Sequence, residues 1–194
     1  MSATTRWSRA DVVVCAALVA VAAAALPTGV GANHRTVAAP SLPLAVAALV
    51  PSLTAQGGAE MTVLGLSIYD GWYWGDGHIW APERTYLIDL HYHRSLTGVR
   101  IAERSVAEIE AIGRGSPSQR LRWGEAMRRI FPDVTKGDRI TGVHLPAGVV
   151  RFFFNGAPIG DIADAEFARA FFGIWLDPKT SRADFRRQLL GESP

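Results

Sequence analysis

The fold class follows from residues 138–159, which have the sequence DRITGVHLPAGVVRFFFNGAPI. Two apolar runs, 138–145 and 149–154, flank Pro146-Ala147-Gly148, and Asn155-Gly156 follows the second run directly. Asn-Gly is a strong hairpin signal because both residues tolerate a positive φ. The stretch therefore predicts three antiparallel strands in a meander that ends near Ile159.

Upstream of this meander, alternating patterns predict two more strands. Residues 61–74 are expected to form one long strand, with Ser67, Tyr69 and Tyr73 on one face and Trp72 and Trp74 on the other. After the turn signal Gly75-Asp76-Gly77, residues 85–94 predict the next strand. Its polar face would carry Asp89, His91 and His93.

Helices are expected between the strands and after them. Ser105-x-x-Glu108 and Ser116-x-x-Gln119 both have the spacing of a capping box. Asp164 is placed to cap a helix that carries Phe171 and Trp175, and a last helix from Ser181 would stop at Gly191. Strands, helices, strands and helices in this order predict an α+β protein, an antiparallel sheet with helices on one face.

Composition excludes several classes of function. The chain has 194 residues, 48% hydrophobic and 20% charged, with a formal net charge of +2. This charge is too small for a nucleic-acid-binding domain, so no nucleic-acid partner is expected. The single cysteine, Cys15, precludes an intramolecular disulfide and a zinc–cysteine site. Phosphate-loop, nucleophile-elbow and zinc-protease motifs are missing from the sequence, and no cofactor is expected.

The first 32 residues have the pattern of a signal peptide. Arg6 and Arg9 precede the apolar run 12–26, which is shorter than the roughly 20 residues of a bilayer-spanning helix. Small residues at 30–32 favour cleavage after Ala32. We therefore expect an exported protein, periplasmic or secreted, without a membrane span after cleavage; an uncleaved anchor is the alternative. Residues 33–59, rich in proline and poor in charge, predict an extended lead-in that packs on the fold.

Three segments of the mature chain resemble one family. The first is VLGLSIYD at 63–70, the second is FPDVTKGDR at 131–139, and the third comprises NG at 155–156, FARAFFGIWL at 167–176 and LLG at 189–191. They are similar to segments of the bacterial branch of the chalcone isomerase-like proteins. The resemblance implies a chalcone isomerase-like domain over residues 60–194. It also implies an open-faced β-sandwich, a large antiparallel sheet with a layer of helices and a ligand cleft between them.

The family contains both enzymes and binding proteins, so the fold does not decide the function. Catalytic members carry an arginine on the strand that leads into the first segment, where it polarises the substrate carbonyl. This chain has Met61-Thr62 there and no arginine between Arg35 and Arg84. The resemblance therefore implies a non-catalytic binder of an apolar or fatty-acid-like molecule. The alternative is an isomerase that acts on an unknown enone with another cation, such as Arg94, and a second alternative is a scaffold or interaction protein.

Several residues are candidates for the cleft. Tyr69 lies near the position of a cleft hydroxyl in the catalytic branch, and an arginine such as Arg94 would hold an acidic head group. Each candidate also has an ordinary structural explanation, because half-buried tyrosines and aromatic residues at helical spacing are common in cores. The full set of ligand-binding candidates is Ser67, Tyr69, Tyr73, Arg94, Phe171 and Trp175.

His91 and His93 share a strand face, a spacing that binds zinc if a third ligand is near. Most such pairs are surface side chains, so we expect no metal. The sequence identifies neither the ligand nor a protein partner.

Overall fold

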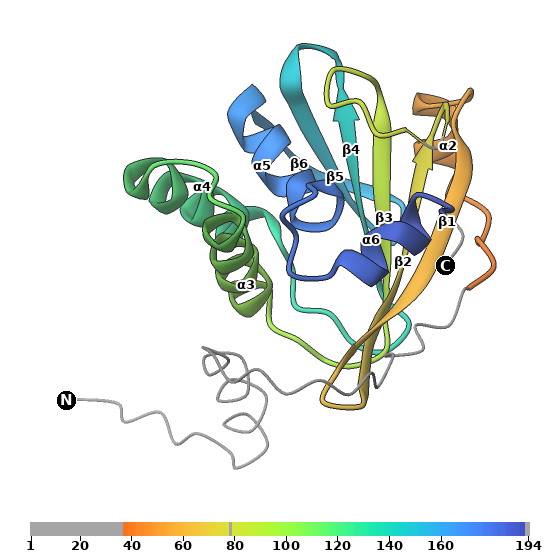
Figure 1. Cartoon of the computed structure of the whole chain (residues 1–194), viewed down its shortest axis with the longest axis horizontal. Coiled ribbons are helices and arrows are strands. Elements are labelled where there is room, and N and C mark those ends of the chain that lie inside the picture. The colour runs from red at the N-terminus through yellow and green to blue at the C-terminus, as the bar shows by residue number, and fades with distance from the viewer. Residues whose placement is uncertain (1–36, 78, 193–194) are drawn as a thin grey trace. The chain divides into compact units, whose positions relative to one another are not determined.

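The computed structural model describes residues 37–77 and 79–192, and these form the body shown in colour in Figure 1. The predicted signal peptide, residues 1–32, lies outside the described residues. Within the described ranges, no helix combines the length and apolar character needed to cross a bilayer.

A single six-stranded sheet forms the centre of the fold. The strands lie side by side in chain order, every neighbouring pair is antiparallel, and Figure 1 shows them running from β1 at the right to β6 at the left. The predicted fold class, an antiparallel sheet layered with helices, is confirmed. The strands are β1 (Thr54–Val63), β2 (Leu66–Gly75), β3 (Tyr86–Tyr92), β4 (Arg139–Leu145), β5 (Val149–Phe154) and β6 (Ala157–Ala163).

The meander that the sequence predicted over residues 138–159 is β4–β5–β6. The short helix η1 (Pro146–Gly148) joins β4 to β5. The Asn155-Gly156 turn joins β5 to β6, and both of its residues have positive φ, 49° and 85°. The hairpin signal was therefore correct, and its physical basis is the backbone conformation that these two residues tolerate.

The single long strand expected over residues 61–74 is wrong. The chain reverses at Leu64 and Gly65, whose φ angles are 51° and 74°, so that β1 and β2 form a hairpin. An apolar leucine at positive φ is uncommon, and its local sequence gives little warning of a turn. The predicted faces hold for residues 69–74. The expected shared face of Ser67 and Tyr69 is wrong, because the β1–β2 register shifts at Ile68, which packs with Tyr69 against the main core.

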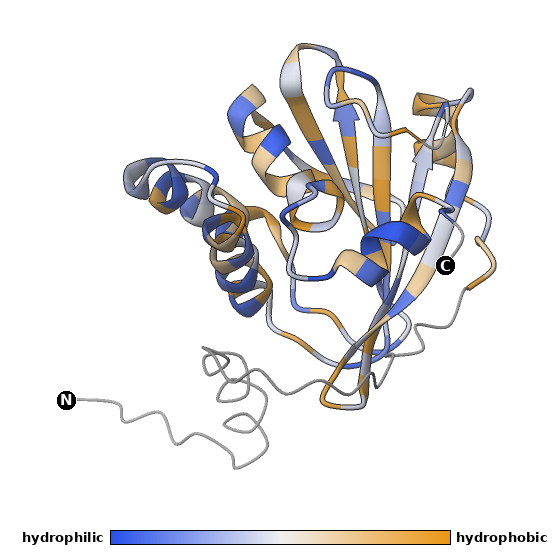
Figure 2. Cartoon of the chain, in the orientation of Figure 1, coloured by the Kyte–Doolittle hydropathy of each residue, from blue (hydrophilic) through white to orange (hydrophobic). Residues whose placement is uncertain are grey.

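Four helices cover one face of the sheet. They are α3 (Gly98–Ala111), α4 (Pro117–Ile130), α5 (Ala165–Leu176) and α6 (Ala183–Leu189). Together with the strand residues that face them they enclose the main core, which includes Tyr86, Phe152, Phe167 and Phe172. Figure 2 shows many hydrophilic residues along α3 and α4.

The helix starts were predicted in part. Ser116 and Gln119 form the expected capping box of α4, and Asp164 accepts hydrogen bonds from the first backbone N–H groups of α5. The box expected at Ser105 is wrong, because α3 begins earlier and Thr97 caps it. Ser105 instead lies inside α3 and donates to the carbonyl of Ile101 at 2.8 Å, an alternative partner for a helical serine.

The segment before the domain packs on the opposite face of the sheet, which we call the open face. Residues 37–43 are extended, and the helix α2 (Leu44–Leu49) follows them. Val46 of α2 joins Leu87, Val143 and Phe153 in a second, smaller core on this face. The expected lead-in, residues 33–59, thus contains a helix and the start of β1.

Two side chains of the sheet hold the extended segment in place. The indole N–H of Trp72 donates to the carbonyl of Val37 at 3.1 Å, and the guanidinium of Arg139 donates to the carbonyl of Ser41 at 3.0 Å. Both donors lie on the open face, so the segment crosses that face and shields part of it from solvent.

Candidate functional site

Two of the predicted ligand-binding residues, Tyr69 and Trp175, are in contact between the sheet and the helices, and a third, Arg94, follows the end of β3. We call Tyr69, Arg94 and Trp175 the head-group cluster. Tyr69 projects from β2 toward the helices, and its hydroxyl accepts a hydrogen bond from the indole N–H of Trp175 on α5 at 3.0 Å. The rings of Tyr92 and Phe185 lie edge-on to the Tyr69 ring, with centroids 5.9 and 6.1 Å away.

The Tyr69 hydroxyl is a hydrogen-bond donor rather than a base. Burial raises its pKa to about 12, although the hydrogen bond from Trp175 acts in the opposite direction. The hydroxyl therefore keeps its proton near neutral pH. Since Trp175 supplies the proton of the bond that they share, the proton of Tyr69 remains to be donated to a third group.

Arg94 lies two residues beyond the strand partner of Tyr69. Tyr69 pairs with Tyr92, and the backbone N–H of His93 donates to the carbonyl of Ile68 at 2.9 Å, one residue further along. Ser67 does not continue the face of Tyr69, because the β1–β2 register shifts between Met61 and Thr62, which leaves Ile68 as an extra residue of β2 and pairs Ser67 with Thr62. Ile68 instead joins Tyr69 in packing against the main core.

Ser67 and Arg94 each carry a buried polar atom. Within the described part of the chain, neither Ser67 Oγ nor Arg94 Nη1 has a hydrogen-bond partner. A buried donor without a partner destabilises a protein by about 1–3 kcal/mol, so natural cores contain few of them. Of the two, Arg94 is cationic and is therefore suited to an anionic oxygen.

Further charges surround the cluster on the helix side. Arg104 and Arg182 favour the ionised form of Tyr69, while Glu108 opposes it, which places all three near the hydroxyl. Glu108 is paired with Arg104 and accepts a hydrogen bond from Ser181 at 3.1 Å. Three arginines against one carboxylate leave this end of the layer positive, which favours the approach of an anion.

The other two ligand-binding candidates lie elsewhere. Tyr73 is at the far end of β2, where burial raises its pKa to about 12 and its ring centroid lies 6.1 Å from that of Tyr86. Phe171 lies in the middle of the main core, with ring centroids 5.2 Å from Phe152 and 5.4 Å from Trp175. Phe171 therefore adjoins the head-group cluster through Trp175, and Tyr73 does not.

A second polar cluster near Tyr73 was not predicted. The hydroxyl of Tyr86 and the indole N–H of Trp80 are buried, and neither has a hydrogen-bond partner of normal geometry among the described residues. His144 stacks on Tyr86 at 4.7 Å, its Nδ1 lies 2.6 Å from the carbonyl oxygen of Arg84, and burial lowers its pKa. Local sequence gave no signal for this cluster, because the loop that carries Trp80 is placed only by tertiary packing.

The polar side chains of β3 lie on the open face, away from the head-group cluster. Asp89 is fully buried there and forms two hydrogen bonds with Arg139, at 2.6 and 2.7 Å, and one with Thr141 at 2.7 Å. Burial alone would raise the pKa of Asp89, but hydrogen bonds from His91 and Arg139 outweigh burial and lower it. His91 Nε2 lies 3.2 Å from Asp89, so this imidazole is engaged with the buried carboxylate.

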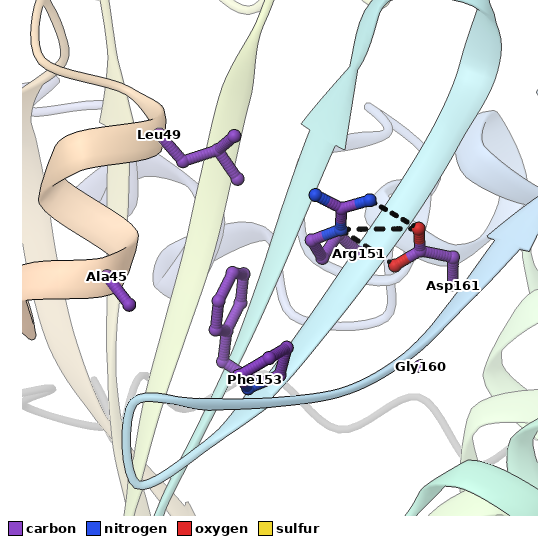
Figure 3. Close-up of a pocket in the computed structure, with 7 residues that line it drawn as sticks. Ala45, Leu49, Arg151, Phe153, Gly160 and Asp161 are labelled. Atoms are coloured by element: carbon purple, nitrogen blue, oxygen red, sulfur yellow. Dashed lines mark hydrogen bonds and ion pairs between the residues drawn. The ribbon is translucent and has the colours of Figure 1, made fainter.

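The larger of two surface hollows also lies on the open face, between α2 and strands β5 and β6 (Figure 3). Its volume is about 400 Å³. Leu49 and Phe153 supply apolar walls, and the ion pair between Arg151 and Asp161, 2.7 Å long, lines one side. The cleft implied by the resemblance lies on the other side of the sheet, where the rings of Phe171, Phe172 and their neighbours pack closely.

Comparisons with known proteins agree with this architecture. The family model described as chalcone isomerase-like matches residues 94–191. An uncharacterized protein of Haemophilus influenzae is 28% identical over 138 residues, which cover 71% of this chain and 67% of that protein.

Among solved structures, the crystal structure of the Arabidopsis thaliana fatty-acid binding protein AtFAP1 is similar with a TM-score of 0.56. Its sequence identity is 12%, and the alignment covers 72% of this chain and 87% of that one. At this identity the similarity concerns the fold. The family match spans half of the chain, and the six-stranded sheet with its helical layer agrees with the fold of that family. This chain therefore belongs to the chalcone isomerase-like family.

Proposed function

We propose that this protein binds an amphipathic acid of the fatty-acid class, with the carboxylate at the head-group cluster and the apolar chain in the layer between sheet and helices. The observation that carries the proposal is the buried guanidinium atom Arg94 Nη1, which has no hydrogen-bond partner among the described residues and belongs to a residue two positions beyond Tyr92, the strand partner of Tyr69. The fold shared with a fatty-acid binding protein supports the same ligand class.

The chemistry of the cluster suits a carboxylate. A guanidinium and a protonated phenol are both donors, and a carboxylate accepts through two oxygens. Hydrogen bonds between ionised partners are roughly twice as strong as neutral ones, so Arg94 would supply most of the energy. Tyr69 would add a second donor, because its pKa of about 12 keeps it protonated.

The apolar part of the ligand would have to displace side chains. Tyr92, Phe185 and Trp175 surround the cluster, and Phe171 continues the aromatic layer toward the centre of the sheet. These rings already pack in edge-to-face pairs, so a long acyl chain enters only if some of them change rotamer. We therefore expect binding to report on this layer through the fluorescence of Trp175.

The test compares an acid with its uncharged analogue. Purified, delipidated protein is titrated with palmitate and with hexadecanol in a calorimeter below the micellar concentration. Palmitate should bind once per chain and at least tenfold more tightly than hexadecanol, since loss of a charge-assisted hydrogen bond weakens binding by about 1.5–3 kcal/mol. Equal affinities, or no binding of either compound, would overturn the proposal.

A second candidate function uses the same cation for catalysis. Met61, at the position of the family arginine, is buried and apolar, so it supplies no charge to a substrate carbonyl. Arg94 and Tyr69 are donors that would stabilise an enolate oxygen if an enone bound between them. Turnover of a hydroxychalcone, lost in Arg94→Met, would favour the isomerase. Absence of both palmitate binding and turnover would favour a scaffold instead.

We further propose that the protein acts after export from the cytoplasm, with residues 1–32 removed. The support is the basic start, the short apolar run and the small residues at 30–32 in the sequence. Amino-terminal sequencing of the protein from its native host should begin at Asn33. A mature protein that still begins at Met1 would contradict cleavage.

A further inference from the structure

The open face carries a cluster of metal-ligating side chains that the proposed function does not use. Glu60 on β1, Asp70 on β2 and His93 just after β3 each offer one ligand atom, and these atoms all lie within 4.8 Å of one another. His93 Nε2 is 3.0 Å from Asp70 Oδ2. One imidazole and two carboxylates form a donor set that zinc and similar divalent ions accept.

Strand pairing positions two of the three side chains, and the third follows the end of β3 directly. Glu60 and Asp70 are direct cross-strand partners in the β1–β2 ladder, so both side chains project from the open face. The backbone N–H of His93 donates to the carbonyl of Ile68 at 2.9 Å, which places its imidazole diagonally next to Asp70. The cluster therefore joins three adjacent strands.

The electrostatics of the Glu60–Asp70 pair favour a bound cation. Like charges directly opposite one another in a sheet are destabilising, and Glu60 and Asp70 are such a pair. The neighbouring carboxylate, Asp89, is hydrogen-bonded by Arg139 and Thr141 and is not part of the cluster. His91 contacts Asp89, whereas His93 contacts Asp70, so the two histidines serve different carboxylates.

Solvent can reach the cluster. The side chains of His93 and Asp70 are 33% and 17% exposed, enough for an ion to enter and for water to complete its coordination. We propose that Glu60, Asp70 and His93 bind one divalent transition-metal ion of the zinc class, which would tie β1, β2 and β3 together. Zinc–ligand distances are about 2.0–2.2 Å, so the side chains would draw inward by small rotamer changes.

The test uses tag-free protein freed of metal by a chelator. Zinc chloride is titrated in a calorimeter, and the absorption of the cobalt complex provides a second readout of coordination. The wild-type protein should bind one ion per chain, and its midpoint of thermal unfolding should rise with zinc. His93→Asn and Asp70→Asn should each lower the affinity at least tenfold and abolish the shift in midpoint.

His91→Asn is the matched control, because it removes an imidazole from the same face outside the proposed ligand set. His91 is the cross-strand partner of Asp70, but its ring contacts Asp89 rather than a proposed ligand. The variant should keep the affinity within about threefold of wild type, a factor that corresponds to about 0.65 kcal/mol. Circular dichroism without metal checks that each variant folds, and Glu60→Gln replaces any variant that does not.

Two results would overturn the proposal: no stoichiometric binding by wild type, or an equal loss in His91→Asn and His93→Asn. Because the cluster shares no residue with the head-group cluster, palmitate binding and zinc binding are measured as separate outcomes, and failure of one leaves the other standing.

Discussion

Replacing Arg94 by methionine should make the unliganded protein more stable and its ligand affinity lower. Methionine keeps much of the apolar length of the side chain and removes the guanidinium. Arg94 Nη1 is buried without a hydrogen-bond partner among the described residues, and such a group destabilises the folded state by about 1–3 kcal/mol. Because Arg94 as a whole is only partly buried, we expect a gain near the lower limit, about 1 kcal/mol.

The effect on binding has the opposite sign. If the carboxylate of the ligand rests on Arg94, its removal forfeits a charge-assisted hydrogen bond of about 1.5–3 kcal/mol. That loss corresponds to a decrease in affinity of about 10- to 150-fold. Gain of stability with loss of affinity is the behaviour of a residue retained for binding rather than for folding.

Two assays measure these quantities. Urea denaturation followed by circular dichroism gives the free energy of unfolding, and a gain of 1 kcal/mol should also raise the thermal midpoint by about 2–4 °C. Calorimetric titration with palmitate gives the affinity. Arg84→Met is the control, because Arg84 lies in an exposed ion pair with Asp76, its side chain 57% exposed, and should change neither quantity measurably.

One pattern of results would refute the reasoning. If Arg94→Met lowers the free energy of unfolding by more than about 1 kcal/mol and leaves the affinity for palmitate unchanged, then Arg94 has a structural role. The carboxylate would then have to bind elsewhere, and the assignment of the head-group cluster would be wrong.

Further predictions concern the buried charges and the aromatic core. Asp89→Ala leaves the largely buried Arg139 without its carboxylate, so it should lower the free energy of unfolding, measured by urea denaturation, by about 3–5 kcal/mol. Asp161→Ala breaks an exposed ion pair and should lower the same free energy by less than about 1 kcal/mol. The pKa of Asp89 is lowered in the folded state, so its contribution to the free energy of unfolding is complete above the unfolded pKa of about 3.9 and is lost as pH falls through the folded pKa. The urea midpoint of the wild type should therefore decrease below about pH 4. The midpoint of Asp89→Ala should decrease less over the same range. Phe172→Ala should lower the free energy of unfolding by about 3–5 kcal/mol, because Phe172 is fully buried and packs edge-on against Tyr86 at 4.8 Å; a loss below 1 kcal/mol would mean that the aromatic layer is loosely packed.

Local sequence was sufficient to predict the backbone conformation where one short-range interaction decides it. The Asn155-Gly156 turn needs two residues that accept a positive φ, and the start of α4 needs the reciprocal pair Ser116 and Gln119. The alternation of residues 69–74 likewise assigned each side chain to a face, whereas the register shift at Ile68 has no signal in the pattern. These signals depend on neighbours in the chain, so the antiparallel sheet and its helical layer could be predicted.

The same reasoning failed where the chain itself gave a misleading signal. Leu64 has no property that marks a turn, and it adopts positive φ because pairing of β1 with β2 stabilises the hairpin. Ser105 had the spacing of a cap, but α3 begins at Gly98 because Thr97 caps it and the carboxylate of Asp133 accepts a hydrogen bond from the Gly98 N–H at 2.8 Å. That second partner lies 35 residues away and is invisible to a local pattern.

Residue patterns alone predicted the fold class, the candidates for the cleft and the family resemblance, although they merged the end of β1 with β2 and missed α2. Which candidates lie together is a property of the tertiary structure. Tyr69 meets Trp175 through the packing of α5 on the sheet, and Glu60 meets Asp70 and His93 because hydrogen bonds between strands set one register among several that the alternation allows. A pattern of period two assigns a residue to a face of the sheet, but its neighbours on that face depend on the strand beside it.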